Sequence, residues 1–105
     1  KSLAQLVAEL PRYYQDAVRI EVEDARKADV VARATETLRV RLAGEIQRTD
    51  TTDGTKWFLR GGRWLLLRPS GTEPVVRAYS DARSPEDATG LVALARQEFE
   101  RALAA

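Results

Sequence analysis

The chain has 105 residues, which suits one domain, and its 44% hydrophobic and 31% charged residues indicate a globular protein and argue against disorder. The 17 basic and 16 acidic residues nearly cancel, so a net charge of +1 lacks the basic excess of a dedicated nucleic-acid or anionic-membrane binder. The sequence contains no cysteine and no histidine, which excludes disulfides, thiolate metal sites, cysteine nucleophiles and a Ser-His-Asp triad.

No targeting or membrane segment is visible. No apolar run approaches the roughly 20 residues that a membrane helix needs, and no signal peptide is present, so we expect a cytoplasmic protein without a membrane partner. The chain opens at Lys1 and contains no methionine, which favours a fragment of a longer protein. Because it contains no repeat or linker, residues 1–105 are interpreted as a single domain.

The first half of the chain predicts two helices and a strand. Ser2 can cap a short helix that ends at Pro11. Residues 17–23 alternate between apolar and polar side chains, which predicts a half-buried strand. Apolar residues then recur at three- and four-residue spacing over 24–43, which predicts a longer helix that stops at Gly44. Its charged residues are interpreted as a solvated face, namely Arg26, Lys27, Arg33, Glu36 and Arg39.

The middle of the chain predicts strands joined by tight turns. A strand is expected over 45–51, with a turn at Asp53-Gly54. Two apolar runs, 55–60 and 63–68, predict a β-hairpin that turns at Gly61-Gly62 through a two-residue turn. The second arm is apolar enough to be buried on both faces.

The end of the chain predicts a strand over 75–80 and a final helix. Ser84 can cap that helix, with Pro85 at its first position and two acids in its first turn. Trp57 and Trp64 are expected to pack in the core or across the hairpin. This order of elements favours an α+β fold, an antiparallel or mixed sheet with helices on one face.

The loop over residues 68–74, Arg-Pro-Ser-Gly-Thr-Glu-Pro, lies between two apolar strands and carries the chemistry. Arg68 supplies a planar charged fork that matches phosphate oxygens, and Ser70 and Thr72 supply hydroxyl donors. Gly71 lets the backbone approach an anion and can take a left-handed conformation, so that successive N–H groups form an anion-binding concavity. The same residue types also make ordinary surface turns, and composition leaves both interpretations open.

Two charged residues beside the loop are candidates for its support. Arg77, on the next strand, could brace the loop by pairing with Glu73, or could assist a bound phosphate. Glu73 has no catalytic partner nearby in the sequence and is interpreted as structural. We expect no catalytic residue and no metal ligand in this chain.

The loop and its surroundings resemble the C-terminal domain of the α-D-phosphohexomutase family, the phosphoglucomutases and phosphomannomutases. The resemblance covers about residues 1–105 and is strongest over 53–82. Its motifs are Asp53-Gly54-Thr55-Lys56, Trp64-Leu65-Leu66-Leu67 running into the loop, and Arg77, Tyr79 and Asp81-Ala82. It implies a fold similar to TATA-box-binding protein, α+β, with a four-stranded antiparallel or mixed sheet and helices packed on one face.

The resemblance also implies a function. Arg68, Ser70, Gly71 and Thr72 would hold the substrate phosphate that is not being transferred. The parent enzyme would interconvert hexose 1-phosphate and hexose 6-phosphate through the 1,6-bisphosphate, using Mg²⁺ and a phosphoserine in other domains of the same chain. The loops that would carry the phosphoserine and the Mg²⁺ ligands are absent from this sequence. The fragment is therefore expected to be inactive, with a phosphate affinity on the order of millimolar. The alternative is a free-standing module for a phosphorylated ligand or nucleic acid, against which the +1 charge argues.

Overall fold

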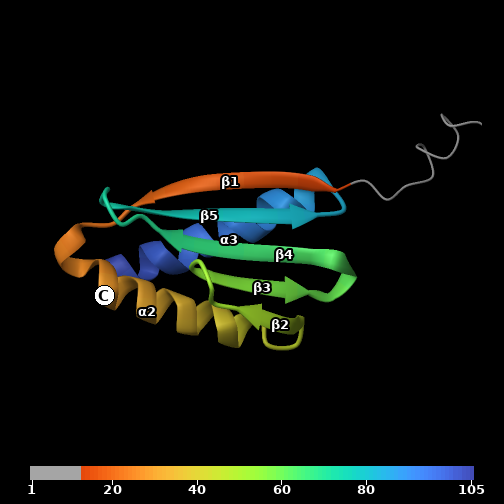
Figure 1. The fold of residues 1–105 in the computed structure, drawn as a ribbon, viewed down its shortest axis with the longest axis horizontal. Helices are drawn as coiled ribbons and strands as arrows, with labels where there is room; N and C mark the ends of the chain where they lie inside the picture. The colour runs from red at the N-terminus through yellow and green to blue at the C-terminus, as the bar shows by residue number, and fades with distance from the viewer. Residues whose placement is uncertain (1–12) are drawn as a thin grey trace, which may run out of the picture.

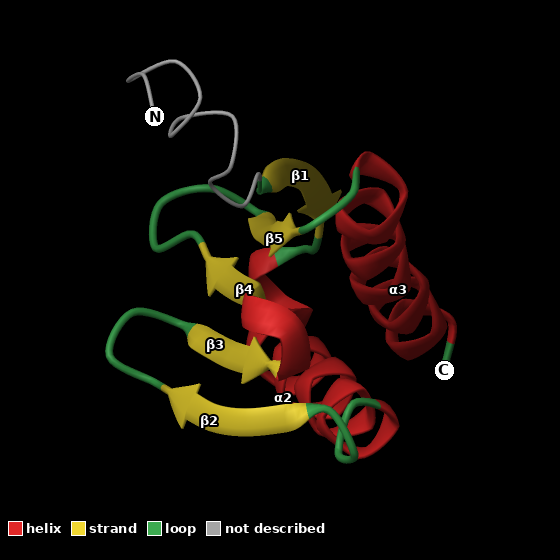
Figure 2. Cartoon of the chain, turned by 90° about the vertical axis from the view of Figure 1, so that its right-hand side faces the viewer, coloured by secondary structure: helices red, strands yellow, loops and turns green. Residues whose placement is uncertain are grey.

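The computed structural model describes residues 13–105, and the short helix expected before Pro11 lies outside the described residues. The described part is α+β, with one sheet and two helices on the same side of it (Figures 1 and 2). In chain order the elements are β1 (Tyr14–Glu21), α2 (Asp24–Arg41), β2 (Ile46–Asp50), β3 (Thr55–Leu59), β4 (Arg63–Pro69), β5 (Val75–Ala82) and α3 (Pro85–Ala104).

The sheet has five strands in the order β1-β5-β4-β3-β2, and each pair of neighbours is antiparallel. The four-stranded sheet that the resemblance implies is therefore wrong. The five strand segments expected from the sequence, 17–23, 45–51, 55–60, 63–68 and 75–80, each have a counterpart in the sheet. The side chains of β2 are mostly exposed at one edge of the sheet. The α2 helix carries the chain behind the sheet from β1 at one edge to β2 at the other (Figure 1). The closer likeness to TATA-box-binding protein stays a prediction.

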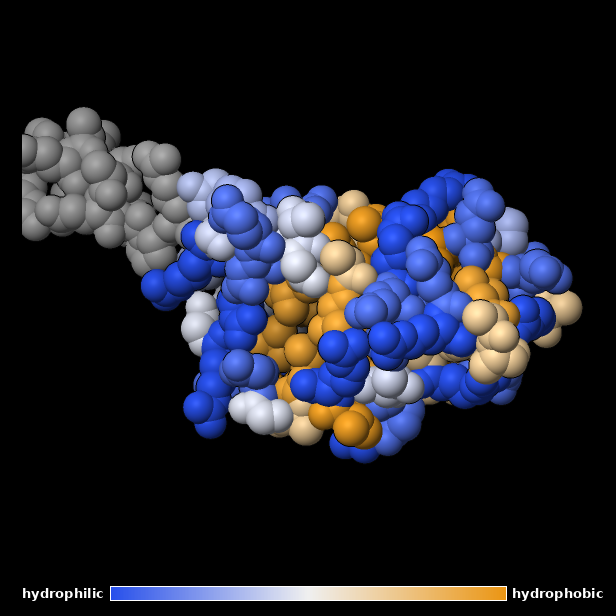
Figure 3. Space-filling view, turned by 180° about the vertical axis from the view of Figure 1, so that it is seen from behind, coloured by the Kyte–Doolittle hydropathy of each residue, from blue (hydrophilic) through white to orange (hydrophobic). Residues whose placement is uncertain are grey.

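The hydrophobic core lies between the sheet and the two helices. Leu65 and Leu67 of β4 and Ala78 of β5 point into it, and Leu38 and Phe99 enter it from α2 and α3. Figure 3 shows the helix-bearing side, where apolar side chains reach the surface in a band framed by hydrophilic residues. No helix within residues 13–105 is long and apolar enough to span a membrane.

The final helix begins as the sequence predicts. The Ser84 hydroxyl accepts a hydrogen bond from the backbone N–H of Asp87, and Pro85 takes the first helical position. Ser80, on β5, is fully buried and donates its hydroxyl to the carbonyl oxygen of Ala88 at 2.7 Å. The first bond caps α3, and the second holds its first turn against the sheet.

The hairpin between β3 and β4 differs from its prediction in two ways. Leu59 pairs with Arg63, so the connection contains three residues, Arg60–Gly62, instead of two. Both glycines in it have positive φ, as the sequence suggested. The prediction that β4 is buried on both faces is also wrong, because neither α2 nor α3 covers the second face of the sheet. We call that second face the open face.

The two tryptophans lie on opposite faces of the sheet and provide a matched test of this assignment. Trp57 is 1% exposed in the core, whereas Trp64 is half-buried on the open face, with the Lys56 amine 4.2 Å from its ring centroid. We expect Trp57→Ala to lower the free energy of unfolding by about 3–5 kcal/mol. Trp64→Ala should cost about 1 kcal/mol. Urea unfolding of both variants measures this, and equal losses would contradict the assignment of faces.

Candidate functional site

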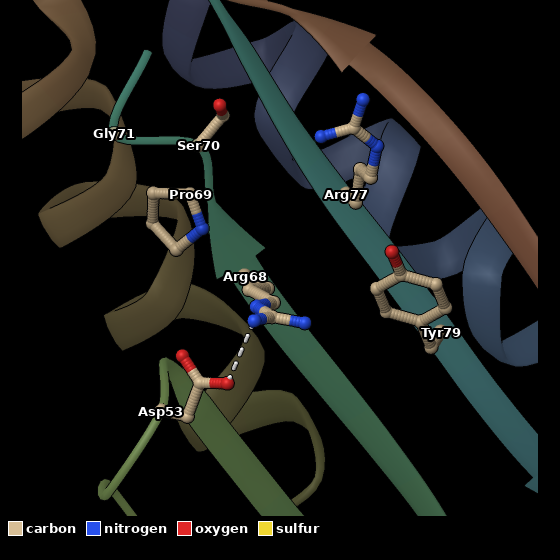
Figure 4. Close-up of a pocket in the computed structure, with 7 residues that line it drawn as sticks. All are labelled: Asp53, Arg68, Pro69, Ser70, Gly71, Arg77 and Tyr79. Atoms are coloured by element: carbon tan, nitrogen blue, oxygen red, sulfur yellow. Dashed lines mark ion pairs between the residues drawn. The ribbon is translucent and has the colours of Figure 1, made fainter. Parts of the chain in front are cut away.

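The loop between β4 and β5 borders a cavity of about 400 Å³ at the edge of the open face. This volume lies within the range of about 300–1,000 Å³ typical of small-molecule sites. The residues that line it are Asp53, Arg68, Pro69, Ser70, Gly71, Arg77 and Tyr79 (Figure 4). Three of the four residues expected to contact phosphate therefore surround one cavity, and Thr72 lies next in the loop without lining it. Their contact with phosphate stays a prediction.

Three arginines form a row across the open face beside this cavity. Arg68 on β4 is paired in register with Arg77 on β5, which is paired with Arg19 on β1. Like charges directly opposite one another destabilise a sheet, so the row needs compensating anions. Two carboxylates provide them. The Glu73 carboxylate oxygens lie 3.2 Å from a guanidinium nitrogen of Arg77 and 3.5 Å from one of Arg19. A carboxylate oxygen of Asp53 lies 3.1 Å from a guanidinium nitrogen of Arg68.

The loop is closed from within by the side chain of Ser70. The Ser70 hydroxyl oxygen accepts hydrogen bonds from the backbone N–H groups of Thr72, at 3.3 Å, and Glu73, at 3.1 Å. The Ser70 N–H donates to the carbonyl oxygen of Val75 at 3.0 Å. Since both hydroxyl contacts use the oxygen as an acceptor, the O–H group can still donate to a ligand in the cavity.

Gly71 does not adopt the left-handed conformation that the sequence analysis allowed for it. The glycines with positive φ among residues 13–105 are Gly54, Gly61 and Gly62. The hydrogen bonds to the Ser70 hydroxyl complete the turn without a positive φ at Gly71. A Cβ added at Gly71 would meet nothing within 4 Å, so what the glycine contributes is an unobstructed backbone beside the cavity.

Lys27 contacts the loop, and its assignment to a solvated face is wrong. Its side chain is 15% exposed, and its amine donates to the carbonyl oxygens of Ser70, at 2.8 Å, and Glu73, at 2.6 Å. A cation in the first turn of a helix opposes the helix dipole, and this anomaly is the signal that could have marked Lys27 in the sequence. Sequence reasoning also missed Arg19, and it named Asp53 and Tyr79 only as parts of larger motifs.

Glu73 joins the loop to the arginine row by charge. Its pKa lies below the ordinary value because Arg77 donates a hydrogen bond to the carboxylate, and the charges of Arg19 and Arg77 act in the same direction. A carboxyl whose pKa is lowered by folding stabilises the folded state above its unfolded pKa, near 4.5. That contribution is lost as the pH falls through the lowered folded pKa.

The pH dependence of this pairing can be tested with Glu73→Gln. We expect the variant to have a lower Tm than the parent chain at pH 7. The difference should shrink as the pH falls below about 4.5 and disappear once the pH lies below the lowered pKa of the folded carboxyl. Thermal unfolding followed by circular dichroism across this range gives the difference. Glu100→Gln, at an exposed position of α3, is the control and should change Tm little at any pH. A Glu73→Gln difference that persists unchanged in acid would show that the carboxylate does not act through ion pairing.

Comparison with known proteins gives consistent matches over this chain. The family described as "Phosphoglucomutase/phosphomannomutase, C-terminal domain" matches residues 3–98. A phosphoglucomutase/phosphomannomutase of Thermococcus kodakarensis is 41% identical over 98% of this chain and 21% of its own length. A phosphopentomutase of the same organism is 41% identical over 76% of this chain and 18% of its own length.

A probable phosphoglucosamine mutase of Methanopyrus kandleri is 39% identical over 94% of this chain and 20% of its own length. The chain therefore spans about a fifth of the length of the curated relatives it matches.

Proposed function

The chain belongs to the family of phosphoglucomutase/phosphomannomutase C-terminal domains, and on that basis we propose that it holds the substrate phosphate in a phosphosugar mutase. The whole protein would interconvert hexose 1-phosphate and hexose 6-phosphate by moving a phosphoryl group between the two ends of the sugar. In this proposal the chain supplies binding and orientation, and the transfer itself takes place on groups contributed by other domains.

The observation that carries the proposal is the set of donors around the cavity at the β4–β5 loop. Arg68 offers a charged fork, Ser70 a hydroxyl and Gly71 a backbone with open space where a side chain would stand, and all three line the same cavity. Asp53 pairs with Arg68 through an exposed contact, with side chains 54% and 68% exposed. Exposed ion pairs contribute only about 0–1 kcal/mol, so an incoming phosphate dianion can displace the carboxylate.

A binding site of this kind suits a mutase because it contacts only the phosphate, while the sugar is recognised by other groups. The phosphate that is not transferred stands at position 6 in one half of the reaction and at position 1 in the other. Donors that contact only phosphate oxygens serve both orientations equally. The names of the relatives support this, since phosphopentomutase and phosphoglucosamine mutase share this domain with phosphoglucomutase/phosphomannomutase.

Two further groups complete the proposed reaction. We place Mg²⁺ and a phosphoserine in other domains of the whole protein, where they would supply charge neutralisation and the phosphoryl donor. Within residues 13–105, no three carboxylates come together in a group that could hold a metal ion. The described residues therefore do not fit the metal.

A comparison of three sugars tests the proposed function. We expect glucose 1-phosphate and glucose 6-phosphate to shift the same backbone amides over residues 68–72, with dissociation constants in the millimolar range that differ by less than about threefold. Glucose without phosphate should shift none of them. Titration of the ¹⁵N-labelled chain followed by amide NMR provides the measurement. Selectivity of more than about tenfold for one phosphate, or equal binding of glucose, would count against the proposal.

The free-standing nucleic-acid module is the competing function and needs a separate measurement. The net charge of +1 argues against it. A gel shift with duplex DNA at low salt should show no retention, and strong retention would favour that function over the phosphosugar site.

A further inference from the structure

Lys27 has an unusual set of contacts for a helix residue. An ammonium group has three N–H donors, and the amine of Lys27 has three acceptors around it. These are the carbonyl oxygen of Ser70 at 2.8 Å, the carbonyl oxygen of Glu73 at 2.6 Å and a carboxylate oxygen of Asp24 at 2.9 Å. The side chain thus ties two peptide groups of the loop to the first turn of α2, and Asp24 balances its charge.

These bonds set the direction of a peptide group in the proposed phosphate site. In a trans peptide the C=O and the N–H point in opposite directions. The Ser70 carbonyl points toward Lys27 on α2, so the N–H of Gly71, which belongs to the same peptide, points away from α2. Gly71 lines the cavity, and that N–H is one of the donors of the proposed site. A rotation of the same peptide would instead present a carbonyl oxygen to the phosphate and repel it.

We propose that Lys27 is a positioning residue of the phosphate site, which keeps the Ser70 and Glu73 carbonyls turned inward and the Gly71 N–H turned toward the ligand. This inference rests on the proposed function of the loop. Lys27 lies on the side of the loop opposite to that N–H and acts through the backbone without contacting the phosphate.

Other contacts hold the ends of the loop in place without Lys27. The Val22 N–H donates to the Pro74 carbonyl oxygen at 2.9 Å, and the Ser70 N–H donates to the Val75 carbonyl oxygen at 3.0 Å. The Ser70 hydroxyl holds the N–H groups of Thr72 and Glu73. We therefore expect a variant at Lys27 to fold, and to lose the orientation of the Ser70–Gly71 peptide more than the overall shape of the loop.

Three variants separate positioning from simple charge. Lys27→Met keeps the length of the side chain and removes the donors, while Lys27→Arg keeps the charge and the donors. Arg26→Met removes one positive charge from the neighbouring position, where the guanidinium donates to the Leu103 carbonyl oxygen at the end of α3. Each is titrated with inorganic phosphate and followed by the amide NMR signal of Gly71, together with its Tm.

We expect Lys27→Met to weaken phosphate binding about tenfold and to move the Gly71 amide signal before phosphate is added. Arg26→Met should weaken it less than about twofold, and Lys27→Arg should recover part of the loss. The ratio of the phosphate dissociation constants of Lys27→Met and the parent chain should persist at about 1 M salt. The Debye length is then roughly 3 Å, so long-range charge effects vanish.

The outcomes distinguish this inference from the function on which it rests. Equal binding by Lys27→Met and Arg26→Met, or a Lys27→Met loss that vanishes in high salt, would overturn the positioning role while leaving the phosphate site intact. A lower Tm with unchanged phosphate affinity would reduce Lys27 to a purely structural contact. A parent chain that shows no phosphate-dependent shift at residues 68–72 would overturn the proposed function and this inference together.

Discussion

Arg68→Ala is expected to remove measurable phosphate binding from this chain. The Arg68 guanidinium lines the cavity beside Ser70 and Gly71 and offers a charged planar fork there. Arg77 also lines the cavity, but its guanidinium already donates to the Glu73 carboxylate at 3.2 Å. A hydrogen bond to a charged group contributes about 1.5–3 kcal/mol, which corresponds to a loss of about 10- to 150-fold in affinity. Because the starting affinity is expected to be on the order of millimolar, such a loss places binding beyond detection.

A second effect adds to this loss. Asp53 pairs with Arg68 at 3.1 Å, so removal of the arginine leaves a carboxylate at the cavity without its cation. That carboxylate then repels an incoming anion. We accordingly expect Arg68→Lys, which restores the charge but not the fork, to recover binding only in part.

The matched control for Arg68 is Arg48, which lies on the same sheet away from the loop. Its guanidinium stacks over the Phe58 ring at 4.0 Å from the centroid, and it does not line the cavity. Arg48→Ala changes the net charge by the same amount and should leave phosphate-induced amide shifts unchanged. Equal losses from the two variants would mean that the protein attracts phosphate by general charge.

Gly54→Ala is expected to cause the largest loss of stability among single changes near the site. Gly54 has φ +84°, which side chains rarely adopt, and a Cβ there would overlap the carbonyl oxygen of Leu67. The same Cβ would lie 3.2 Å from the Cα of Arg68, so β3 and β4 would have to separate beside the phosphate site. We expect the free energy of unfolding to fall by about 2–4 kcal/mol.

The control for this backbone effect is Gly90→Ala in α3. A Cβ at Gly90 would meet nothing within 4 Å, and the residue lies within a helix. Because glycine is less favourable than alanine in a helix, this variant should gain about 0.5–1 kcal/mol. Urea unfolding of both variants measures the contrast, and a Gly54→Ala chain as stable as the parent would show that β3 and β4 approach less closely than described.

Much of the fold could be predicted because its signals are local in the sequence. The alternation along β1, the three- to four-residue spacing of α2 and the Ser84-Pro85 start of α3 each report a property of neighbouring residues. The order of the strands and the burial of β4 are properties of the assembled sheet. They depend on where β2 attaches and on which face the helices cover, and the spacing of apolar residues records neither.

The candidate site likewise has a part that could be predicted from the sequence and a part that could not. Residues 68–74 are contiguous in the sequence, so the donors of the loop could be named in advance. Arg19 reaches the loop from β1 and pairs with Glu73, 54 positions later in the sequence. Lys27 reaches it from α2 and donates to the carbonyl oxygens of Ser70 and Glu73, 43 and 46 positions later. Only the pairing of β1 with β5 and the packing of the first turn of α2 bring these cations to the loop.

Titration of the ¹⁵N-labelled chain with inorganic phosphate tests the central claim most directly. We expect saturable shifts confined to the amides of the loop and its borders, largest at Gly71, with a dissociation constant on the order of millimolar. Sodium chloride of the same ionic strength serves as the control for salt effects. Shifts spread evenly over the surface, or none at residues 68–72, would contradict the claim that this loop holds a phosphate group.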